Sequence, residues 1–331
     1  MGLSAPGKGS ATALTGAGQT VLAAAIQFEP QIGDVPENLR RAERLGRQAG
    51  EAGARLIVLP EFFSTGMAFA PAIRDEVLRT DGAPFVLLQC LARDYGAIVG
   101  GSFLCTDGQA RNAFMLVAPD GLLGRHDKDL PTMWEHCFYV GGSDDGLIDA
   151  GARYGVAMCW EYMRRPTAQR LRGKVDCIVG GSAWWSVPDH PLRRVTAASR
   201  RRNARNAVHS VTTMARLVGA PVVHGALCGP ISCALLGTPF GYEGRYEGGA
   251  MICDADGRVL ARRPATDGDG VVLAEIIVQG RRPSEALPNR YWLHRRGAVA
   301  AIGWTQQRRY GQRWRARQDR VRPPSRLEVE A

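Results

Sequence analysis

The sequence predicts a layered α/β domain in which helices cover sheets that face each other. Short apolar runs suited to buried strands alternate with segments whose apolar residues recur at helical spacing. Some runs are joined by tight turns, which indicates hairpins, and others are separated by a helix, which indicates crossovers. With 331 residues and 45% hydrophobic content, the chain can bury a large core.

The first strand, helix and strand follow a lead-in of small and polar residues. Residues 1–19 lack hydrophobic periodicity, so we expect them to be disordered. A strand is predicted over 21–28 and a helix over 38–52. The next apolar run, 55–60, is predicted to be a strand that has Glu61 at its end.

The rest of the domain repeats this alternation as far as about residue 280. Helices are predicted over 83–94, 166–172 and 192–218, and strands over 97–103, 113–118, 122–126, 154–159, 176–180, 221–224, 249–254 and 271–277. The Asp-Ala-Asp-Gly segment 254–257 is predicted to be a hairpin turn. We assign 20–280 to one domain and 281–331 to a basic C-terminal extension, which either wraps a partner subunit or stays loose.

The net charge of +10 raises the question of nucleic-acid binding, because arginines cluster at 200–202 and again at 308–317. Arginine is nevertheless spread over nearly the whole chain, and no nucleic-acid-binding motif accompanies it. Net charge informs about solubility and non-specific association, not about fold. We therefore expect no specific nucleic-acid partner.

The chain shows no apolar run long enough for a membrane span and no signal-peptide pattern at its start. Its eight cysteines are scattered, without a C-x-x-C pair, which favours reduced thiols. The six histidines show no metal-ligand spacing. We expect a cytoplasmic protein with no membrane association, no metal and no cofactor.

Three polar residues stand just beyond apolar, strand-like runs: Glu61, Lys128 and Cys159. Each alone has an ordinary explanation, namely a turn carboxylate, a solvated lysine and a buried core cysteine. Together they form a chemical set in which a thiolate attacks, a carboxylate moves protons and an ammonium stabilises developing negative charge. With the three titrations coupled, proton transfer between Cys159 and Glu61 is expected to be near balanced at neutral pH.

Four separated motifs in this order resemble the nitrilase, or carbon–nitrogen hydrolase, superfamily over residues 21–277. They are Leu59-Pro60-Glu61-Phe62, Lys128-Asp129-Leu130-Pro131, Gly155-Val156-Ala157-Met158-Cys159-Trp160-Glu161 and Gly248-Gly249-Ala250-Met251-Ile252. The resemblance implies a four-layer α-β-β-α sandwich that forms a homodimer or a higher homo-oligomer through helices, and a small-molecule substrate.

The resemblance also implies roles for individual residues. Glu61 is the general base, Lys128 stabilises the transition state, and Cys159 is the nucleophile. Glu135 helps to place the lysine and the substrate, unless it is a solvated loop carboxylate. The backbone N–H of Trp160 is the natural second donor to an oxyanion.

Two departures from the family pattern leave the fine structure of the pocket open. The Arg-Ala-x-Glu-Asn stretch usual after the long helix is replaced by Ala215-Arg216-Leu217-Val218-Gly219, and the serine usual in the closing strand is Ala250. Neither change touches the three chemical residues.

The branch of the superfamily is less sharply indicated. Cys159-Trp160-Glu161 and the spacing from Lys128 to Glu135 are similar to nitrilases, whereas segments 162–166 and 181–185 are closer to amidases and carbamoyl-amide hydrolases. We favour hydrolysis of an amide or N-carbamoyl compound by a small margin, with nitrile hydrolysis as the alternative. Acyl transfer and a non-catalytic binding role are further alternatives, the second disfavoured by the intact set of three residues.

Four tryptophans lie near the motifs and could line an apolar substrate pocket: Trp134, Trp160, Trp184 and Trp185. Packing in the core is an equally good explanation for each, because large aromatic residues dominate protein cores.

Overall fold

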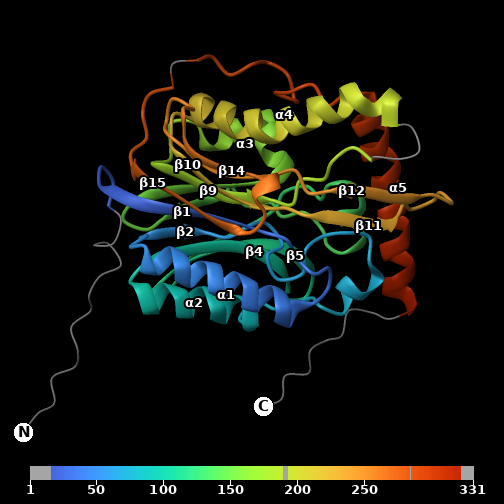
Figure 1. Cartoon of the computed structure of the whole chain (residues 1–331), viewed down its shortest axis with the longest axis horizontal. Helices are drawn as coiled ribbons and strands as arrows, with labels where there is room; N and C mark the ends of the chain where they lie inside the picture. The colour runs from blue at the N-terminus through green and yellow to red at the C-terminus, as the bar shows by residue number, and fades with distance from the viewer. Residues whose placement is uncertain (1–15, 189–192, 284, 322–331) are drawn as a thin grey trace, which may run out of the picture.

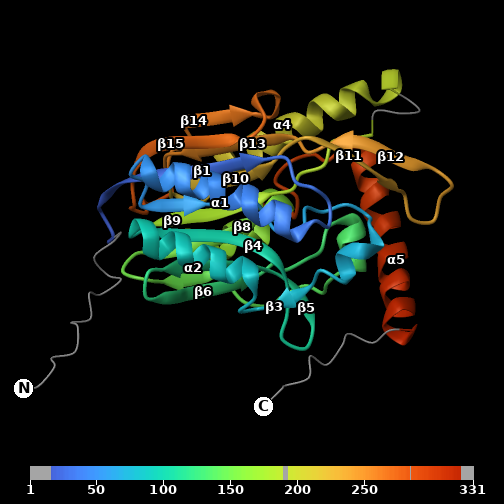
Figure 2. The same ribbon diagram turned by 60° about the horizontal axis from the view of Figure 1, so that its bottom comes forward.

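The computed structural model describes residues 16–188, 193–283 and 285–321, and most of the predicted lead-in lies outside these residues. Two helical layers enclose two layers of strands (Figure 1). Helices α1 and α2 lie on one side of the strands and α3 and α4 on the other, while α5 stands across the end of the layers. Figure 2, turned by 60°, shows the same position of α5 beside the strands β11 and β12.

The first sheet has the strand order β6-β5-β4-β2-β1-β15. Its members are β1 (Thr20–Phe28), β2 (Leu56–Val58), β4 (Ile98–Thr106), β5 (Ala110–Ala118), β6 (Gly121–Asp127) and β15 (Gly270–Ile277), with the short β3 (Leu78–Arg79) paired to β4. Strands β1, β2 and β4 run parallel, and β5, β6 and β15 are added in antiparallel fashion.

The second sheet has the order β7-β8-β9-β10-β13-β14. Its members are β7 (Leu147–Asp149), β8 (Arg153–Met158), β9 (Cys177–Ser182), β10 (Val222–Leu227), β13 (Gly248–Cys253) and β14 (Val259–Pro264). The two sheets are joined at one end, where β1 and β10 pair in parallel over two residues, Gln27 with Ala226 and Phe28 with Leu227. This join brings the carboxyl ends of the parallel strands of both sheets to one region.

Five α-helices and four short 3₁₀ helices complete the described fold. They are α1 (Val35–Glu51), α2 (Ala83–Tyr95), α3 (Arg165–Leu171), α4 (Arg193–Val218), α5 (Ala298–Val321), η2 (Pro71–Arg74), η3 (Met133–Cys137), η4 (Cys159–Met163) and η5 (Ala265–Asp267). Helix α1 begins three residues earlier than the sequence predicts, because the side chain of Asp34 accepts a hydrogen bond from the backbone N–H of Glu37 and caps it.

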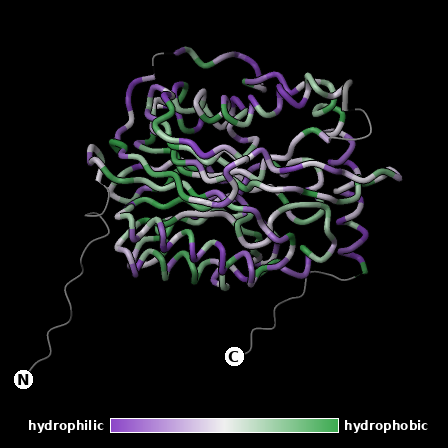
Figure 3. The backbone as a smooth tube through the Cα atoms, in the orientation of Figure 1, coloured by the Kyte–Doolittle hydropathy of each residue, from purple (hydrophilic) through white to green (hydrophobic). Residues whose placement is uncertain are grey.

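Three hydrophobic clusters fill the spaces between the four layers. One packs α1 and α2 against the first sheet, and it includes Leu45, Leu91 and Ile57. A second lies between the sheets and takes alternate residues of strands from both, such as Val58 of β2 and Val156 of β8. A third packs α3 and α4 against the second sheet. These clusters confirm the four-layer α-β-β-α sandwich, and hydrophobic segments are correspondingly prominent in the central strands (Figure 3).

Six of the described strands and α-helices were not predicted: β3, β7, β11, β12, β14 and α5. Strand β14 pairs with β13 through the predicted turn at 254–257, so this turn leads to β14 and not directly to β15. Strands β11 (Pro230–Ala234) and β12 (Gly241–Arg245) form a separate hairpin. Residues 298–321 of the C-terminal extension form α5, which packs against η3 of the same chain. Within the described parts of the chain, no helix combines the length and apolarity that a membrane span requires.

Candidate active site

Glu61 lies buried at the end of the segment that follows β2. Its Oε1 accepts hydrogen bonds from Asn112 Nδ2 at 3.0 Å and Lys128 Nζ at 2.8 Å. Its Oε2 accepts a hydrogen bond of 3.0 Å from the backbone N–H of Ala183, the residue that follows β9. Three donors from both sheets thus fix the position of this carboxylate.

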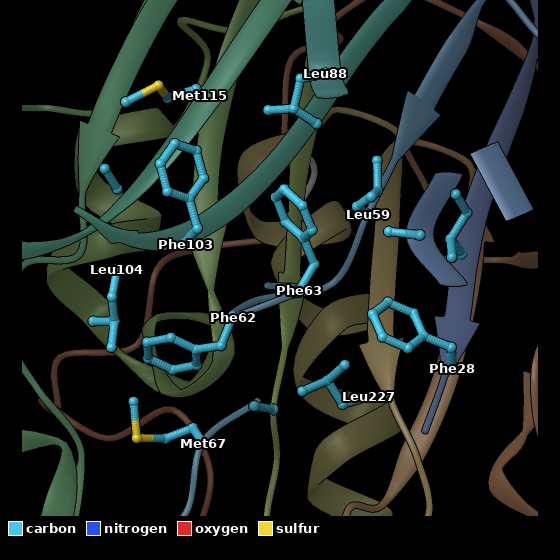
Figure 4. Packing of buried hydrophobic residues seen from close by; sticks show 14 of the residues in the cluster. Phe28, Leu59, Phe62, Phe63, Met67, Leu88, Phe103, Leu104, Met115 and Leu227 are labelled. Atoms are coloured by element: carbon cyan, nitrogen blue, oxygen red, sulfur yellow. The ribbon is translucent and has the colours of Figure 1, made fainter. Parts of the chain in front are cut away.

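The residues after Glu61 anchor this segment in the core. Phe62 and Phe63 point into the hydrophobic cluster on the α1 and α2 side, where they lie close to Phe103 and Leu104 of β4 (Figure 4). The rings of Phe63 and Phe103 meet edge to face at 5.9 Å. The carboxylate of Glu61 is therefore held by a rigid, well-packed stretch of backbone.

Lys128 follows β6 and is fully buried between two carboxylates. Its Nζ donates to Glu61 Oε1 and, at 2.7 Å, to Glu135 Oε2. Burial alone would lower the pKa of Lys128, but Glu135 and Glu61 raise it above the ordinary lysine value. The side chain is consequently a fixed ammonium ion.

Glu135 lies in η3 and is buried, so the explanation as a solvated loop carboxylate does not apply. Its Oε2 accepts hydrogen bonds from the Thr132 backbone N–H at 2.8 Å and from the Tyr139 hydroxyl. Burial raises the pKa of Glu135 to about 7, against the opposing charge of Lys128. These contacts place Glu135 as a support of the lysine.

Cys159 occupies the first position of η4, directly after β8. Burial, together with the negative charge of Glu61, raises the pKa of its thiol well above the ordinary value, against the influence of Lys128. The backbone N–H of Trp160 acts in the opposite direction and lowers the pKa of the thiol. Burial at Cys159 therefore favours the protonated thiol, whereas the nearby ammonium favours the thiolate.

Three non-glycine residues of the described chain have positive φ, and all three lie at this site. They are Phe62 at 55°, Met133 at 51° and Cys159 at 48°. L-residues adopt this left-handed conformation at a cost of about 1–3 kcal/mol each in strained settings. At Cys159 it forms the sharp turn from β8 into η4.

Two glycines allow the strands of the second sheet to approach the backbone around Glu61. A Cβ on Gly181 would stand 2.8 Å from the Glu61 nitrogen, and one on Gly225 would stand 2.7 Å from the carbonyl carbon of Leu59. Backbone would have to shift to admit either side chain. The glycines are thus part of what brings the ends of β9 and β10 to the site.

A second buried charge network lies behind Lys128 and Cys159, centred on Glu161. Glu161 Oε2 accepts a hydrogen bond from the Met158 backbone N–H at 2.8 Å, and Oε1 accepts one from the Asp129 backbone N–H at 3.1 Å. Both carboxylate oxygens lie 3.2 Å from His126 Nε2. Burial alone would raise the pKa of Glu161, but His126, with the nearby arginines, lowers it well below its usual range.

A cavity of about 300 Å³ is lined by Trp134 and Trp160, the neighbours in sequence of Glu135 and Cys159. Three of the four tryptophans expected in a substrate pocket, Trp134, Trp160 and Trp185, line it. Trp184 does not; it packs against Trp160, with ring centroids 6.1 Å apart, and its Nε1 donates to Asn203 at 3.1 Å.

The structure brings Glu61, Lys128 and Glu135 into direct contact and places the thiol of Cys159 within their electrostatic reach. Other members of the site were not singled out from the sequence: Asn112, Tyr139, His126, Glu161 and the backbone N–H of Ala183. The sequence did offer a signal for Glu161, since this residue belongs to the Cys-Trp-Glu motif. Asn112 had none, because it is one polar residue in an apolar strand.

Among the residues that the structure describes, no group of three or more histidine, cysteine, aspartate or glutamate side chains is arranged to hold a metal ion. The described cysteines are all free thiols, and most are buried.

A four-layer sandwich with an acid, an ammonium and a thiol buried at neighbouring strand ends is the arrangement of the nitrilase superfamily. The sequence model of the carbon-nitrogen hydrolase family matches residues 22–283, and the chain belongs to this family. Its matched region ends before α5.

Named relatives include both nitrile and amide hydrolases. A nitrilase from Pyrococcus abyssi is 29% identical over 201 residues, which cover 58% of this chain and 74% of that protein. An N-carbamoylputrescine amidase from Solanum tuberosum is 33% identical over 169 residues, 46% of this chain and 55% of that protein. A carbon-nitrogen hydrolase structure from Helicobacter pylori superposes with a TM-score of 0.66 at 18% identity, covering 79% of this chain and 90% of that one. This last likeness supports the fold alone.

Proposed function

We propose that this protein is a thiol hydrolase that cleaves the carbon–nitrogen bond of a small amide or N-carbamoyl compound and uses Glu61, Lys128 and Cys159. The observation that carries the proposal is the buried Lys128 ammonium, bonded to Glu61 and Glu135 beside the Cys159 thiol. The two carboxylates carry two negative charges and the ammonium carries one positive charge. The site therefore keeps one uncompensated negative charge, and a carboxylate can accept the proton of the thiol.

In the first half of the reaction, Glu61 takes the proton of Cys159 and the thiolate attacks the substrate carbonyl carbon. Negative charge develops on the carbonyl oxygen, where the Lys128 ammonium and the Trp160 backbone N–H stabilise it. Glu61 returns the proton to the leaving nitrogen. The C–N bond breaks, ammonia or an amine departs, and a thioester remains on Cys159.

In the second half, Glu61 takes a proton from water, and the resulting hydroxide attacks the thioester. The C–S bond breaks, the sulfur regains a proton from Glu61, and the carboxylic acid is released. A carbamoyl substrate gives a carbamic acid by the same steps. The residues need no other reactant than water.

Nitrile hydrolysis by the same residues is the second candidate, favoured by the relative named nitrilase and by the Cys159-Trp160-Glu161 motif. The thiolate then adds to the nitrile carbon to form a thioimidate, and two waters give the acid and ammonia. Acyl transfer to an amine in place of water is a further alternative, and a binding role without catalysis is the last.

Ammonia release from a panel of primary amides, N-carbamoyl compounds and nitriles tests the proposal. We expect release from amides or N-carbamoyl compounds, and its loss in Cys159→Ala. Cys253→Ala, which removes another buried thiol, is the matched control and should retain activity. Release from nitriles alone would favour the second candidate. No release by folded protein, with or without added amine acceptors, would refute a catalytic role for Cys159.

Assembly into a homodimer or a higher homo-oligomer remains a proposal from the family resemblance, and a cytoplasmic location remains a proposal from the sequence. Light scattering on the full chain measures the oligomeric state, and cell fractionation measures the location. A monomer at micromolar concentration would contradict the proposed assembly.

A further inference from the structure

The cavity beside the proposed catalytic residues is built from segments far apart in the chain. Trp160 follows the nucleophile, Trp134 precedes Glu135, Trp185 follows β9 and Tyr242 lies in β12. Helix α5 supplies the remaining wall, which includes Ala300, Gly303 and Gln307. Trp160 and Ala300, which line the cavity, share a hydrophobic cluster with Cys159, and Trp160 is the next residue after the thiol.

The chemistry of the wall is apolar and uncharged. Aromatic rings form much of it, with Trp134 and Trp185 at a centroid separation of 4.3 Å and Trp134 and Tyr242 at 5.2 Å. None of the described residues that line the cavity carries a charge. Burying a polar group of a ligand here without a hydrogen-bond partner is unfavourable, and burying an unpaired charged group is far more so. The wall therefore selects against ionic substituents.

Two buried polar atoms on the wall lack partners within the described structure. Gln307, which is 3% exposed, donates from Nε2 to the Leu236 carbonyl at 3.1 Å, and this bond fixes the amide orientation. Its Oε1 has no hydrogen-bond partner, and neither has the indole N–H of Trp134. Buried polar atoms are nearly always hydrogen-bonded in folded proteins, so an unpaired acceptor on a residue that lines the cavity points to a hydrogen bond that a ligand would supply.

We propose that the substrate is an uncharged molecule whose non-reacting part is a bulky apolar group, bearing a hydroxyl or similar donor that hydrogen-bonds Gln307 Oε1. This inference rests on the proposed function, since it places the reacting carbon next to Cys159. Helix α5 lies outside the family-matched residues 22–283, so this part of the wall is not described by the family model.

Turnover of five primary amides, or the matching nitriles, tests the substrate class. They are propionamide, phenylacetamide, 4-hydroxyphenylacetamide, 4-aminobutyramide and succinamate, which vary size, hydrogen bonding and charge. We expect kcat/KM for the aromatic amides to exceed that for the charged ones by about tenfold or more. A charged amide as the best substrate would overturn the proposal.

Gly303 permits a direct test of the wall. A Cβ at this position would meet only Met133 Cε, at 3.7 Å, so a larger side chain fits into the cavity without disturbing the helix. Gly303→Leu should lower the ratio of kcat/KM for phenylacetamide over propionamide about tenfold. Thr305→Leu, on an exposed part of the same helix, is the control and should leave the ratio unchanged. An unchanged ratio in Gly303→Leu would also overturn the proposal.

Gln307→Met keeps the length of the side chain and removes the acceptor. The preference for 4-hydroxyphenylacetamide, or for its 2- or 3-hydroxy isomers, over phenylacetamide should disappear in this variant. Equal kcat/KM for hydroxylated and plain amides in the unaltered protein would contradict the role of Gln307.

Binding separates this inference from the proposed function. Phenylacetamide should bind the inactive Cys159→Ala variant in titration calorimetry, and Gly303→Leu in that background should weaken binding about tenfold. Binding without turnover in the active protein would refute the proposed function and retain the cavity as an apolar site. Turnover of small amides without binding of phenylacetamide would retain the proposed function and refute the apolar substrate site.

Discussion

The carboxylate of Glu161 accepts a hydrogen bond of 3.1 Å from the backbone N–H of Asp129, the residue after Lys128. The same carboxylate accepts a bond from the Met158 N–H, directly before Cys159. One buried side chain therefore ties together the two strand ends that carry the ammonium and the thiol. Its role is positioning, since it contacts the backbone and the charged side chains behind the site.

Replacement of Glu161 by Gln should destabilise the protein and reduce kcat. The change leaves buried His126, Arg164 and Arg170 with less compensating charge, and breaking a buried ion pair in this way costs about 3–5 kcal/mol. Urea unfolding measures this loss. Glu43→Gln, which removes an exposed pair with Arg47, is the control and should cost less than about 1 kcal/mol. Equal effects of the two substitutions would contradict the positioning role.

Stability should decline as the pH rises from about 6.5 to about 9. Burial alone would lower the pKa of His126, but Glu161 and Asp144 raise it from its ordinary 6.5 to about 9. The folded state therefore binds more protons than the unfolded state in this window. The stabilisation, roughly 3 kcal/mol, is fully present below pH 6.5 and is lost through pH 9.

Unfolding free energies measured between pH 6 and pH 9.5 check this slope. In His126→Asn the titrating group is absent, so the variant should be less stable at pH 6 and its stability should vary less with pH. A slope that persists unchanged in the variant would assign the pH dependence to other groups.

Glu61→Gln should lower kcat by about 10²–10⁴ while the protein stays folded. The amide keeps the shape of the carboxylate, but it cannot accept the thiol proton, and the thiol at Cys159 is held protonated by burial. Single-turnover measurements of thioester formation would locate the loss in the first chemical step. Wild-type rates in this variant would exclude Glu61 as the base.

Two glycine-to-alanine changes in helices should have opposite effects on stability. In α1, a Cβ on Gly50 would stand 2.2 Å from the ring of Tyr95, so Gly50→Ala should cost about 2 kcal/mol. In α5, the Cβ on Gly303 has room, and Gly303→Ala should stabilise the protein by up to about 1 kcal/mol. Thermal unfolding of both variants under one condition makes the comparison; shifts of the same sign would contradict it.

The layers of the fold could be predicted because periodicity reports burial. The strand over 21–28 and the helix over 83–94 agree with β1 and α2 to within about a residue at each end. Strand β14 was missed since its burial pattern is mostly exposed, so it shows no apolar run. Helix α5 was missed for a similar reason: few of its residues are buried, among them Ala300 and Trp304.

The candidate site could be predicted only where side chains stand in short motifs. Glu61, Lys128 and Cys159 each follow a strand, and each stands in a recognisable sequence motif. The donors that hold them come from elsewhere in the chain, as Asn112 and the Ala183 N–H do for Glu61. Such contacts depend on strand register and on the closeness of two sheets, which no local pattern encodes.

The left-handed backbone at Cys159, Phe62 and Met133 bears on how this protein can evolve. Glycine adopts this conformation freely, so at any of these positions a glycine would relieve strain that the native side chain maintains. At position 159, glycine would relieve the backbone strain but would also remove the thiol. The proposed role of Cys159 as the nucleophile would explain why this turn carries a thiol where glycine would be less strained.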